Sequence, residues 1–339
     1  MWRVPRSSAH FAPPLRALLR QYDAGSPLAC EPVDQGLLNR GYRLATTRGR
    51  YFLKHHFDPE TADPAAIARQ HRATERLAAL GVPVAPPLPA ADGRTVTVIS
   101  GASYALHPWV EGRHRSGAQL TAAQCRTLGA LLGLVHACLE QVMGAAPARG
   151  RASADPADTL ELIGTLLARV RRHQPHDAFD ELARHRLVER RELLESCAGR
   201  RPPQASATGW VHGDFHPFNL LYQGGVPAAI VDWDRLGVQP RAEEAVRAAV
   251  IFFVRPVGTL DLPKVRAYAR AYRRASGAGA DELATAVHRV WWERLNDFWI
   301  LRWRYERGDH RADPQFPAAS ALAVWWTNEY GAVRDAFAE

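Results

Sequence analysis

The chain has 339 residues, of which 47% are hydrophobic, and carries a formal net charge of +8. Its four scattered cysteines include no C-x-x-C pair, which argues against a disulfide framework or a cysteine zinc site. No uninterrupted apolar run approaches the ~20 residues that span a bilayer, and the N-terminus lacks the apolar segment of a signal peptide. We therefore expect a globular, cytoplasmic protein with no membrane partner.

The positive charge does not predict a nucleic-acid partner. All but two of the 43 basic residues are arginines, and they are dispersed along helical segments, often near acids. No basic run interleaved with aromatic residues occurs. The length favours two lobes, which we place at residues 1–110 and 111–339. We expect a monomer, with a homodimer as the alternative.

The first predicted elements form a hairpin over residues 41–56. Tyr42 and Leu44 alternate with polar residues before a turn, as Tyr51 and Leu53 do after it. Lys54 ends the second strand, in a chain that almost never uses lysine. An ammonium on a flexible stem suits a point contact to phosphates; a solvated strand lysine is the alternative.

A helix is predicted over residues 62–80, ended by Gly81 and Pro83. Glu75 is its only acid beyond the first turn and is therefore a candidate ion-pair partner for Lys54. An i,i+3 pair with Arg72 is the alternative. Two further strands are predicted at residues 95–99 and 103–107.

Helical periodicity dominates after Gly112. A helix is predicted over residues 119–142, and His136 within it is expected to be a core or surface residue. Charged helices are predicted over residues 159–170 and 179–194, where acids and arginines at i,i+3 and i,i+4 indicate a solvated cap.

The most informative stretch runs from Trp210 to Asp234 and reads W-V-H-G-D-F-H-P-F-N-L-L-Y, then A-I-V-D-W-D. It contains Asp214 in a tight loop, Asn219 before a short apolar strand and Asp232 after a second one. A carboxylate that receives a proton and two oxygen ligands for a hard divalent cation are what phosphoryl transfer requires. The alternative is an ordinary hairpin, because these residue types also favour turns.

The last hundred residues are predicted to be all-helical and rich in tryptophan. Glu293 and Asp297 stand one turn apart on one predicted helix, where ion pairs with Arg289 and Arg294 are a purely structural alternative. Three tryptophans share one helical face by their spacing, which favours core packing over a ligand cage: Trp292, Trp299 and Trp303.

The H-G-D-x-H-x-x-N pattern and the Ile-Val-Asp-Trp-Asp segment resemble the aminoglycoside phosphotransferase and choline kinase superfamily, the small-molecule relatives of the protein kinases. The resemblance implies an α+β, bilobal, protein-kinase-like fold. A small antiparallel-sheet lobe would bind the nucleotide, and a mostly helical lobe would carry the catalytic loop and the acceptor site.

The resemblance also implies residue roles. Asp214 corresponds to the general base, Asn219 and Asp232 to Mg²⁺ ligands, and Lys54 to the phosphate-binding lysine. The cofactors would be ATP or GTP and Mg²⁺.

Supporting roles follow in the same way. His212 corresponds to a loop-orienting residue and His216 to a loop-bracing one. Asp234 would assist the metal or, as we favour, pair with an arginine. Because residues 34–41 contain two glycines but no G-x-G-x-x-G, Asn39 is the candidate polar residue for the phosphate loop.

Two further sites rest on the resemblance. Aligned on Gly112, the carbonyl of Pro108 would accept from the adenine amine, and the amide of Val110 would donate to the ring; an ordinary strand exit is the alternative. Glu293 and Asp297 would receive a cationic group of the acceptor.

The acceptor is expected to be a small molecule. A helix follows Asp232 within about a dozen residues, which leaves no platform for a polypeptide, and neither H-R-D nor D-F-G occurs. By family analogy we expect phosphorylation of a hydroxyl on a cationic molecule and, first, antibiotic inactivation. A metabolic kinase for choline, homoserine, hydroxylysine or a sugar is the runner-up. A pseudokinase scaffold and a basic nucleic-acid-binding protein are the alternatives from other classes.

Overall fold

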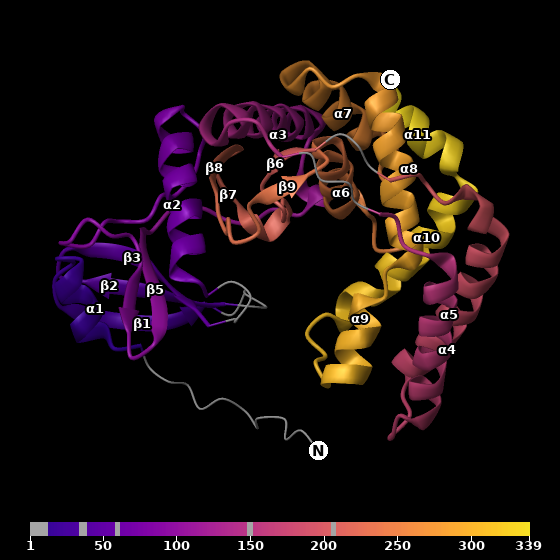
Figure 1. Ribbon diagram of the computed structural model, residues 1–339, viewed down its shortest axis with the longest axis horizontal. Helices are drawn as coiled ribbons and strands as arrows, with labels where there is room; N and C mark the ends of the chain where they lie inside the picture. The colour runs from indigo at the N-terminus through magenta and orange to yellow at the C-terminus, as the bar shows by residue number, and fades with distance from the viewer. Residues whose placement is uncertain (1–12, 34–38, 58–61, 148–151, 205–207) are drawn as a thin grey trace. The chain divides into compact units, whose positions relative to one another are not determined.

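The computed structural model describes residues 13–33, 39–57, 62–147, 152–204 and 208–339. Its internal contacts divide the chain into two compact units (Figure 1). Met1–Arg113 and Phe218–Arg235 form the first, which we call the N-terminal unit, and His114–Pro217 and Leu236–Glu339 form the second, the helical unit. The lobe boundary after residue 110 stays a prediction, and the contacts add residues 218–235 to the N-terminal unit.

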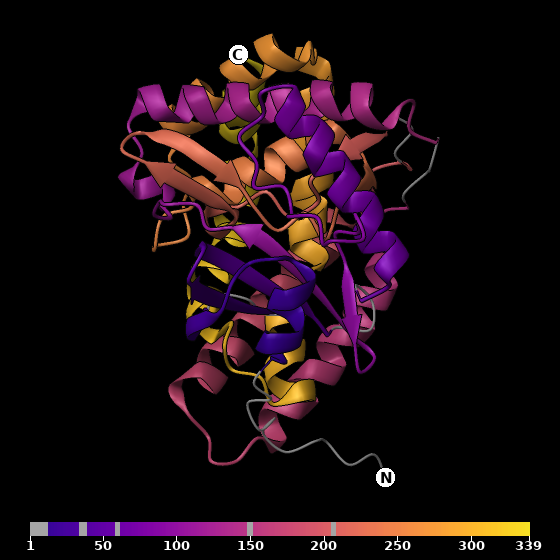
Figure 2. The same ribbon diagram turned by 90° about the vertical axis from the view of Figure 1, so that its left-hand side faces the viewer.

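The N-terminal unit is built on a five-stranded antiparallel sheet in the order β1-β2-β3-β5-β4 (Figure 2). The hairpin predicted over residues 41–56 is confirmed as β2 and β3, and the strands predicted next correspond to β4 and β5. The first strand was not predicted. The bounds are β1 Pro27–Val33, β2 Arg40–Thr46, β3 Gly49–His56, β4 Thr97–Ile99 and β5 Ala102–Pro108.

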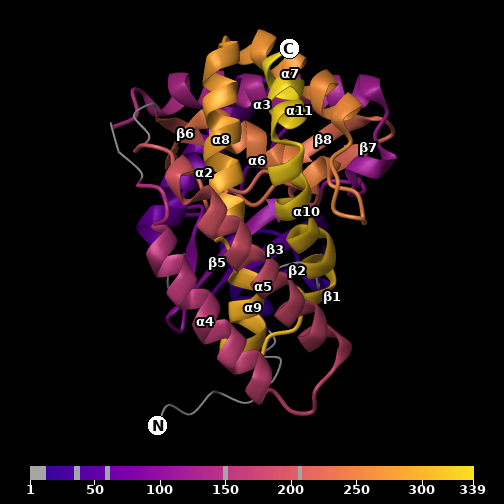
Figure 3. The same ribbon diagram turned by 90° about the vertical axis from the view of Figure 1, so that its right-hand side faces the viewer.

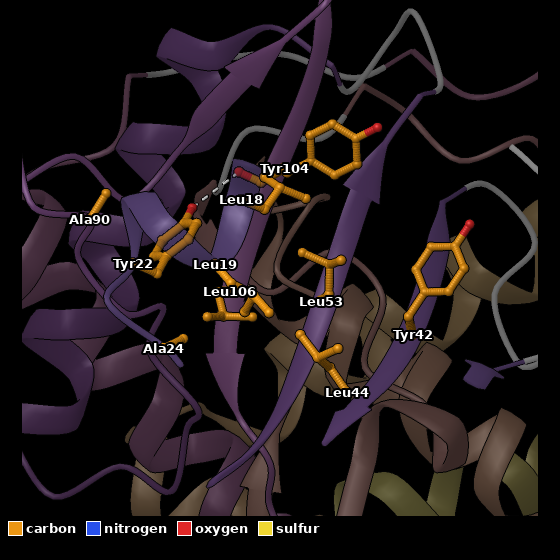
Figure 4. Close-up of a cluster of buried hydrophobic side chains, with 10 residues drawn as sticks. All are labelled: Leu18, Leu19, Tyr22, Ala24, Tyr42, Leu44, Leu53, Ala90, Tyr104 and Leu106. Carbon is orange, nitrogen blue, oxygen red and sulfur yellow. Dashed lines mark hydrogen bonds between the residues drawn. The ribbon is translucent and has the colours of Figure 1, made fainter. Parts of the chain in front are cut away.

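Alternate side chains of this sheet form its core (Figure 4). Leu44, Leu53 and Leu106 are buried and pack with Leu18 and Leu19 of α1 (Leu15–Gln21), a helix that the sequence did not predict. Each buried leucine contributes roughly 1.5–3 kcal/mol through the hydrophobic effect. This core holds β3, and with it Lys54, in a fixed register against β2 and β5.

The helix predicted over residues 62–80 is confirmed as α2 (Pro64–Ala79). Asp63 caps its N-terminus, because the Asp63 side chain accepts hydrogen bonds from two first-turn amides, and proline at the first helical position suits that start. Ile67, His71 and Thr74 are buried at steps of three and four, so one face of α2 packs inward.

A second hairpin, β7 (Leu220–Gln223) with β8 (Val226–Ile230), belongs to the same unit. Ile230 bridges to Val84, and Tyr222 exchanges two backbone hydrogen bonds of 2.9 Å with Arg113. These pairings anchor the hairpin that precedes Asp232.

The helical unit is organised around α3 (Ala122–Met143), which packs along α7 (Leu262–Ser276). A β-carbon on Gly129 would lie 2.1 Å from the Tyr268 carbonyl oxygen, so only glycine permits this close approach. Within the described residues, α3 alone is long and apolar enough to cross a membrane, and more than half of it is buried against the protein. The core helices of proteins that do not cross a membrane share these properties. The sequence showed no uninterrupted apolar run of this length because the apolar residues of α3 are interspersed with polar ones.

The remaining helices complete this unit (Figure 3). The helices predicted over residues 159–170 and 179–194 are confirmed as α4 and α5. They are more than a solvated cap, because one face of each joins a buried apolar cluster with Phe298 and Leu301. The bounds are α4 Pro156–Arg172, α5 Ala178–Cys197, α6 Arg241–Phe253, α8 Ala280–Asn296, α9 Trp299–Arg302, α10 Phe316–Asn328 and α11 Tyr330–Ala338.

The predicted shared face of Trp292, Trp299 and Trp303 is wrong. The helix α8 ends at Asn296, and Asp297 has an extended backbone with ψ 123° before α9 begins at Trp299. Trp292 is a core residue as expected, whereas Trp299 is only half-buried. Regular spacing in the sequence did not reveal the break because no proline or glycine marks it.

Candidate functional site

Within the N-terminal unit, Lys54 lies between two carboxylates. Its Nζ is 2.6 Å from Asp232 Oδ1 and 2.7 Å from Asp234 Oδ1. Burial acts to lower the pKa of Lys54, but the two carboxylates outweigh it and raise this pKa above its ordinary value. The lysine is therefore a fixed positive charge, with only 11% of its side chain exposed.

The β7–β8 hairpin brings Asn219 and Asp232 to one end. Leu220 pairs with Ile230, and the Val231 amide donates to the Asn219 carbonyl at 2.9 Å. Asn219 immediately precedes β7, and Asp232 follows β8 by two residues, so both leave the same end of the hairpin. Asp232 has φ +61°, a left-handed conformation that is uncommon outside glycine and that recurs at functional sites.

The donor chemistry of this hairpin end fits a divalent cation. Amide and carboxylate oxygens are hard ligands, and Mg²⁺ in nucleotide sites takes one or two carboxylates with phosphate oxygens completing its shell. In the described part of the chain, no group of three or more His, Cys, Asp or Glu side chains could hold a metal. Asn219 and Asp232 would hold the ion together with a nucleotide, and the 44% exposure of the Asp232 side chain leaves it accessible.

The expectation that Asp234 pairs with an arginine is wrong. Its carboxylate contacts Lys54 and accepts from Asn39 Nδ2, and its carbonyl accepts from Gln70 Nε2 at 2.8 Å. Asn39, the candidate for the phosphate loop, is therefore a partner of Asp234 in this structure. The loop residues 34–38 lie outside the described residues.

The expectation that Glu75 pairs with Lys54 is also wrong. Glu75 is exposed, because the face of α2 that packs inward carries Ile67, His71 and Thr74. Instead of Glu75, Gln70 of α2 reaches Asp234, and it does so through the backbone carbonyl of Asp234. Glu75 was the candidate because it is the only acid of the predicted helix beyond the first turn, but it lies on the exposed face of that helix.

The proposed adenine-reading residues lie at the end of the sheet. Pro108 closes β5 opposite Tyr51, and the Trp109 amide donates to the Arg50 carbonyl at 3.2 Å. Val110 follows in an irregular segment and is half-buried. The adenine contacts of Pro108 and Val110 stay predictions.

Within the helical unit, a tight turn presents Asp214. The turn follows β6 (Gly209–Val211), a strand paired with β9 (Gly237–Gln239), and Gly213 takes φ +85°. His212 is fully buried, and its Nδ1 accepts from the Asp214 amide at 3.2 Å. His216 Nε2 lies 3.6 Å from Asp214 Oδ2. Contacts of this kind suit the orienting and bracing roles predicted for the two histidines.

The buried carboxylate of Glu244 holds this turn, a role that the sequence did not predict. From the first turn of α6 it accepts from the backbone amides of His212 and Gly213 and from His136 Nε2, the last at 2.7 Å. Burial acts to raise the pKa of Glu244, but the hydrogen bond and charge of His136, helped by His212 and the Gly213 amide, hold it below its ordinary value.

His136 is a buried core residue whose Nδ1 lies 3.0 Å from the Tyr272 hydroxyl. It thereby links α3 and α7 to the turn that carries Asp214. A sequence signal for Glu244 did exist, since an acid followed by Ala245 and Val246 lies in a largely apolar helix.

The predicted acceptor acids lie in different settings. Glu293 accepts from Arg247 at 2.9 Å, and Arg289 pairs instead with Glu243 at 2.5 Å. Asp297 lies beyond the end of α8, with Arg294 3.8 Å away, so the two acids are not on one helix as expected. Their contact with an acceptor stays a prediction.

Comparison with known proteins identifies the family. The model of the phosphotransferase enzyme family matches residues 29–278. The chain belongs to this family. It is accordingly a small-molecule phosphotransferase that acts on a hydroxyl group, and the sequence resemblance is confirmed.

Individual relatives agree with this assignment. A homoserine kinase of Acidiphilium cryptum (strain JF-5) is 25% identical over 268 residues, which cover 79% of this chain and 78% of that protein. Among solved structures, spectinomycin phosphotransferase APH(9)-Ia in complex with ADP and spectinomycin aligns with a TM-score of 0.63 at 15% identity. That alignment covers 93% of this chain and 98% of that one.

Amicoumacin kinase hAmiN, solved with AMP-PNP, Ca²⁺ and Ami, aligns with a TM-score of 0.60 at 19% identity, covering 95% of this chain and 92% of that one. These likenesses confirm the α+β, protein-kinase-like fold predicted from the sequence.

Proposed function

We propose that the protein transfers the γ-phosphoryl group of ATP or GTP to a hydroxyl of a small, amine-bearing molecule, with Asp214 as the general base. The observation that carries the proposal is the placement of Asn219 and Asp232 at one hairpin end, with Lys54 in contact with Asp232. A divalent cation and a phosphate-binding ammonium at such a place serve phosphoryl transfer.

Each residue has a defined task. Lys54 would steady the phosphates through its fixed charge, and Asn219 and Asp232 would hold Mg²⁺, which neutralises charge on the β- and γ-phosphate oxygens when bound. Asp214 would orient the acceptor hydroxyl and accept its proton. Its main chain is positioned by His212 and by the Glu244 carboxylate behind the turn.

The acceptor is proposed to be a small metabolite with a hydroxyl and an amine, such as homoserine. The similarity to a homoserine kinase over 78% of that protein supports this choice. In this chain α6 already begins at Arg241, shortly after Asp232, so no long segment is available to bind a peptide. Antibiotic inactivation, the first expectation from the sequence, becomes the second candidate, supported by the likeness in fold to antibiotic kinases.

A coupled ADP-release assay tests the proposal. Purified protein with Mg²⁺ and ATP or GTP is offered homoserine, choline, aminoglycosides and cationic peptide antibiotics. We expect turnover with one acceptor class. Asp214→Ala should lower turnover by about 10²–10⁴-fold while nucleotide affinity, measured by titration, stays within about twofold. Asp281→Ala, which removes an exposed acid of α8, is the matched control.

Two results would overturn parts of the proposal. If Asp214→Ala abolished nucleotide binding while the protein stayed folded, Asp214 would not be the acceptor base. If no acceptor increased ADP release, the proposed reaction would be wrong.

A further inference from the structure

The helical unit contains a pocket in which three arginines meet. Arg186 and Arg190 come from α5, Arg294 from the last turn of α8, and Asp297, Phe298 and Trp299 from the break that follows. The cavity volume is ≈ 50 Å³, compared with the roughly 10–15 Å³ that one water needs. A group of several heavy atoms therefore fits.

Each of these three arginines has one guanidinium donor that is buried and makes no hydrogen bond to protein among the described residues. These donors are the Nε of Arg186, of Arg190 and of Arg294. Arg190 itself is 5% exposed. A buried charged donor without an acceptor is costly, so such groups usually meet an acceptor of opposite charge.

The charge of the pocket is positive. Asp297 is the one carboxylate among the described lining residues, and it lies 3.8 Å from Arg294. Glu189, outside the lining, pairs with Arg186 at 2.6 Å. Arg190 donates only to backbone carbonyls, at 2.6 Å to Arg294, 3.2 Å to Leu295 and 3.5 Å to Ser320. Burial lowers the pKa of Arg190 to about 10, so this guanidinium still carries its charge at neutral pH.

We propose that this pocket binds the carboxylate of a small zwitterionic molecule, whose ammonium lies at Asp297 and whose methylene groups pack on Phe298 and Trp299. Guanidinium groups match carboxylates in geometry and in charge. A polycationic molecule would be repelled by the three arginines. We infer further that the bound molecule is the phosphoryl acceptor, a step that rests on the proposed function. The acceptor is then a hydroxy amino acid.

Contacts within the helical unit connect the pocket to the turn that carries Asp214. Glu243, next to Glu244 in α6, pairs with Arg289 and Arg247, and Arg247 pairs with Glu293 on α8. Asp297, four residues after Glu293 in the sequence, lines the pocket. These ion pairs thus join α8, which contributes Arg294 to the pocket, to α6, which holds the turn with Asp214.

Arg190 has a structural role that guides the choice of variants. Its hydrogen bonds to the Arg294 and Leu295 carbonyls satisfy the C-terminus of α8, so its replacement would destabilise that helix end. Arg186 and Arg294 are better targets because their side chains make no such bonds. Arg184 is the control, since it lies on the same helix, pairs with Glu181 at 3.3 Å and does not line the pocket.

Calorimetric titration of the full chain tests the pocket without any reaction. The probes are L-2-aminobutyrate, propylamine and inorganic phosphate. We expect L-2-aminobutyrate to bind, with affinity about tenfold weaker in Arg186→Gln and in Arg294→Gln and unchanged in Arg184→Gln. Propylamine should bind far more weakly. Equal binding of L-2-aminobutyrate and propylamine, or arginine-dependent binding of phosphate alone, would overturn the carboxylate assignment.

Kinetics then test whether the bound molecule is the acceptor. L-homoserine and 3-aminopropan-1-ol differ only in the carboxylate. We expect Arg294→Gln to raise KM for L-homoserine about tenfold at nearly constant kcat and to leave KM for 3-aminopropan-1-ol unchanged. Equal changes for both acceptors would show a merely structural effect and overturn the inference. If neither is phosphorylated while the titration succeeds, the acceptor role fails and the carboxylate pocket stands.

Discussion

The carboxylates around Lys54 and the carboxylate behind the Asp214 turn serve opposite purposes. Asp232 contacts a lysine, yet 44% of its side chain is exposed. Glu244 is 4% exposed and is surrounded by amide and imidazole donors. A carboxylate that meets a ligand must keep some accessible surface, whereas one that holds a backbone turn gains from full burial and complete hydrogen bonding. The first group is therefore where substitutions should alter chemistry, and the second is where they should alter stability.

Among substitutions in these two groups of carboxylates and their partners, the largest effect is expected for Asp232→Asn. The substitution keeps the shape of the side chain but removes one metal-binding charge, so kcat should fall about 10²–10³-fold, the size typical of a lost electrostatic contact to the transition state. Mn²⁺ titration followed by electron paramagnetic resonance, with ATP present, should show weaker metal binding at unchanged thermal stability. A normal Mn²⁺ affinity would remove Asp232 from the metal site.

Glu244→Gln should destabilise the fold. A glutamine cannot reproduce the acceptors for two backbone amides and His136, and leaving a buried donor without its charged acceptor costs about 1–3 kcal/mol. Urea unfolding at pH 7 measures the loss. Asp281→Asn, at an exposed site, is the control and should stay within about 0.5 kcal/mol of the wild type. Equal stability of the two variants would show that Glu244 does not hold the turn.

Lys54→Met should act on the nucleotide. Without the ammonium, Asp232 and Asp234 face each other with no positive charge between them, and the phosphates lose a charge-assisted contact. We expect the Kd for ATP to rise about tenfold. Lys264→Met is the matched control, since that lysine donates to the Gly117 carbonyl. Equal ATP affinities would argue against a phosphate contact of Lys54.

The pH dependence of the unfolding free energy tests the role of the Glu244 carboxylate. Because its folded-state pKa lies below the unfolded value of about 4.3, its contribution is complete above that value. The contribution is lost as the pH falls through the folded-state pKa. The difference in unfolding free energy between wild type and Glu244→Gln should therefore be constant from pH 7 to about 5.5 and should shrink towards pH 3. A difference that grew on acidification would contradict the sign of the shift.

The smallest effect is expected for Glu75→Gln. Glu75 is exposed and does not contact Lys54, so ATP affinity should be unchanged and stability should stay within about 0.5 kcal/mol. A loss of ATP affinity comparable to that of Lys54→Met would restore the ion pair that the sequence favoured.

The sequence predicted the elements whose evidence is local. Alternation marked β2 and β3, helical periodicity marked α2 to α5, and compact motifs marked Asp214, Asn219 and Asp232. The contacts that it missed join distant positions. Gln70 reaches Asp234 across 164 positions, and Glu244 meets His136 across 108.

The Glu75–Lys54 ion pair was predicted from charge, without the orientation of the helix. Glu75 was chosen as the acid on the nearest helix, but the orientation of α2 turns it outward and turns Gln70 inward. The arginine pocket could not be predicted from the sequence either. It forms where the chain breaks after Asn296, which places Arg294 and Asp297 beside α5. Neither proline nor glycine, the residues that usually indicate such a break, occurs at this position.

The most direct measurement is ³¹P nuclear magnetic resonance of the complete reaction with ATP, Mg²⁺ and L-homoserine. We expect a phosphomonoester signal that grows in equal amount with ADP in the wild type and that grows at least about a hundredfold more slowly in Asp214→Ala, which still binds ATP. Formation of inorganic phosphate without a phosphomonoester from any acceptor, or an undiminished phosphomonoester signal in Asp214→Ala, would contradict this expectation.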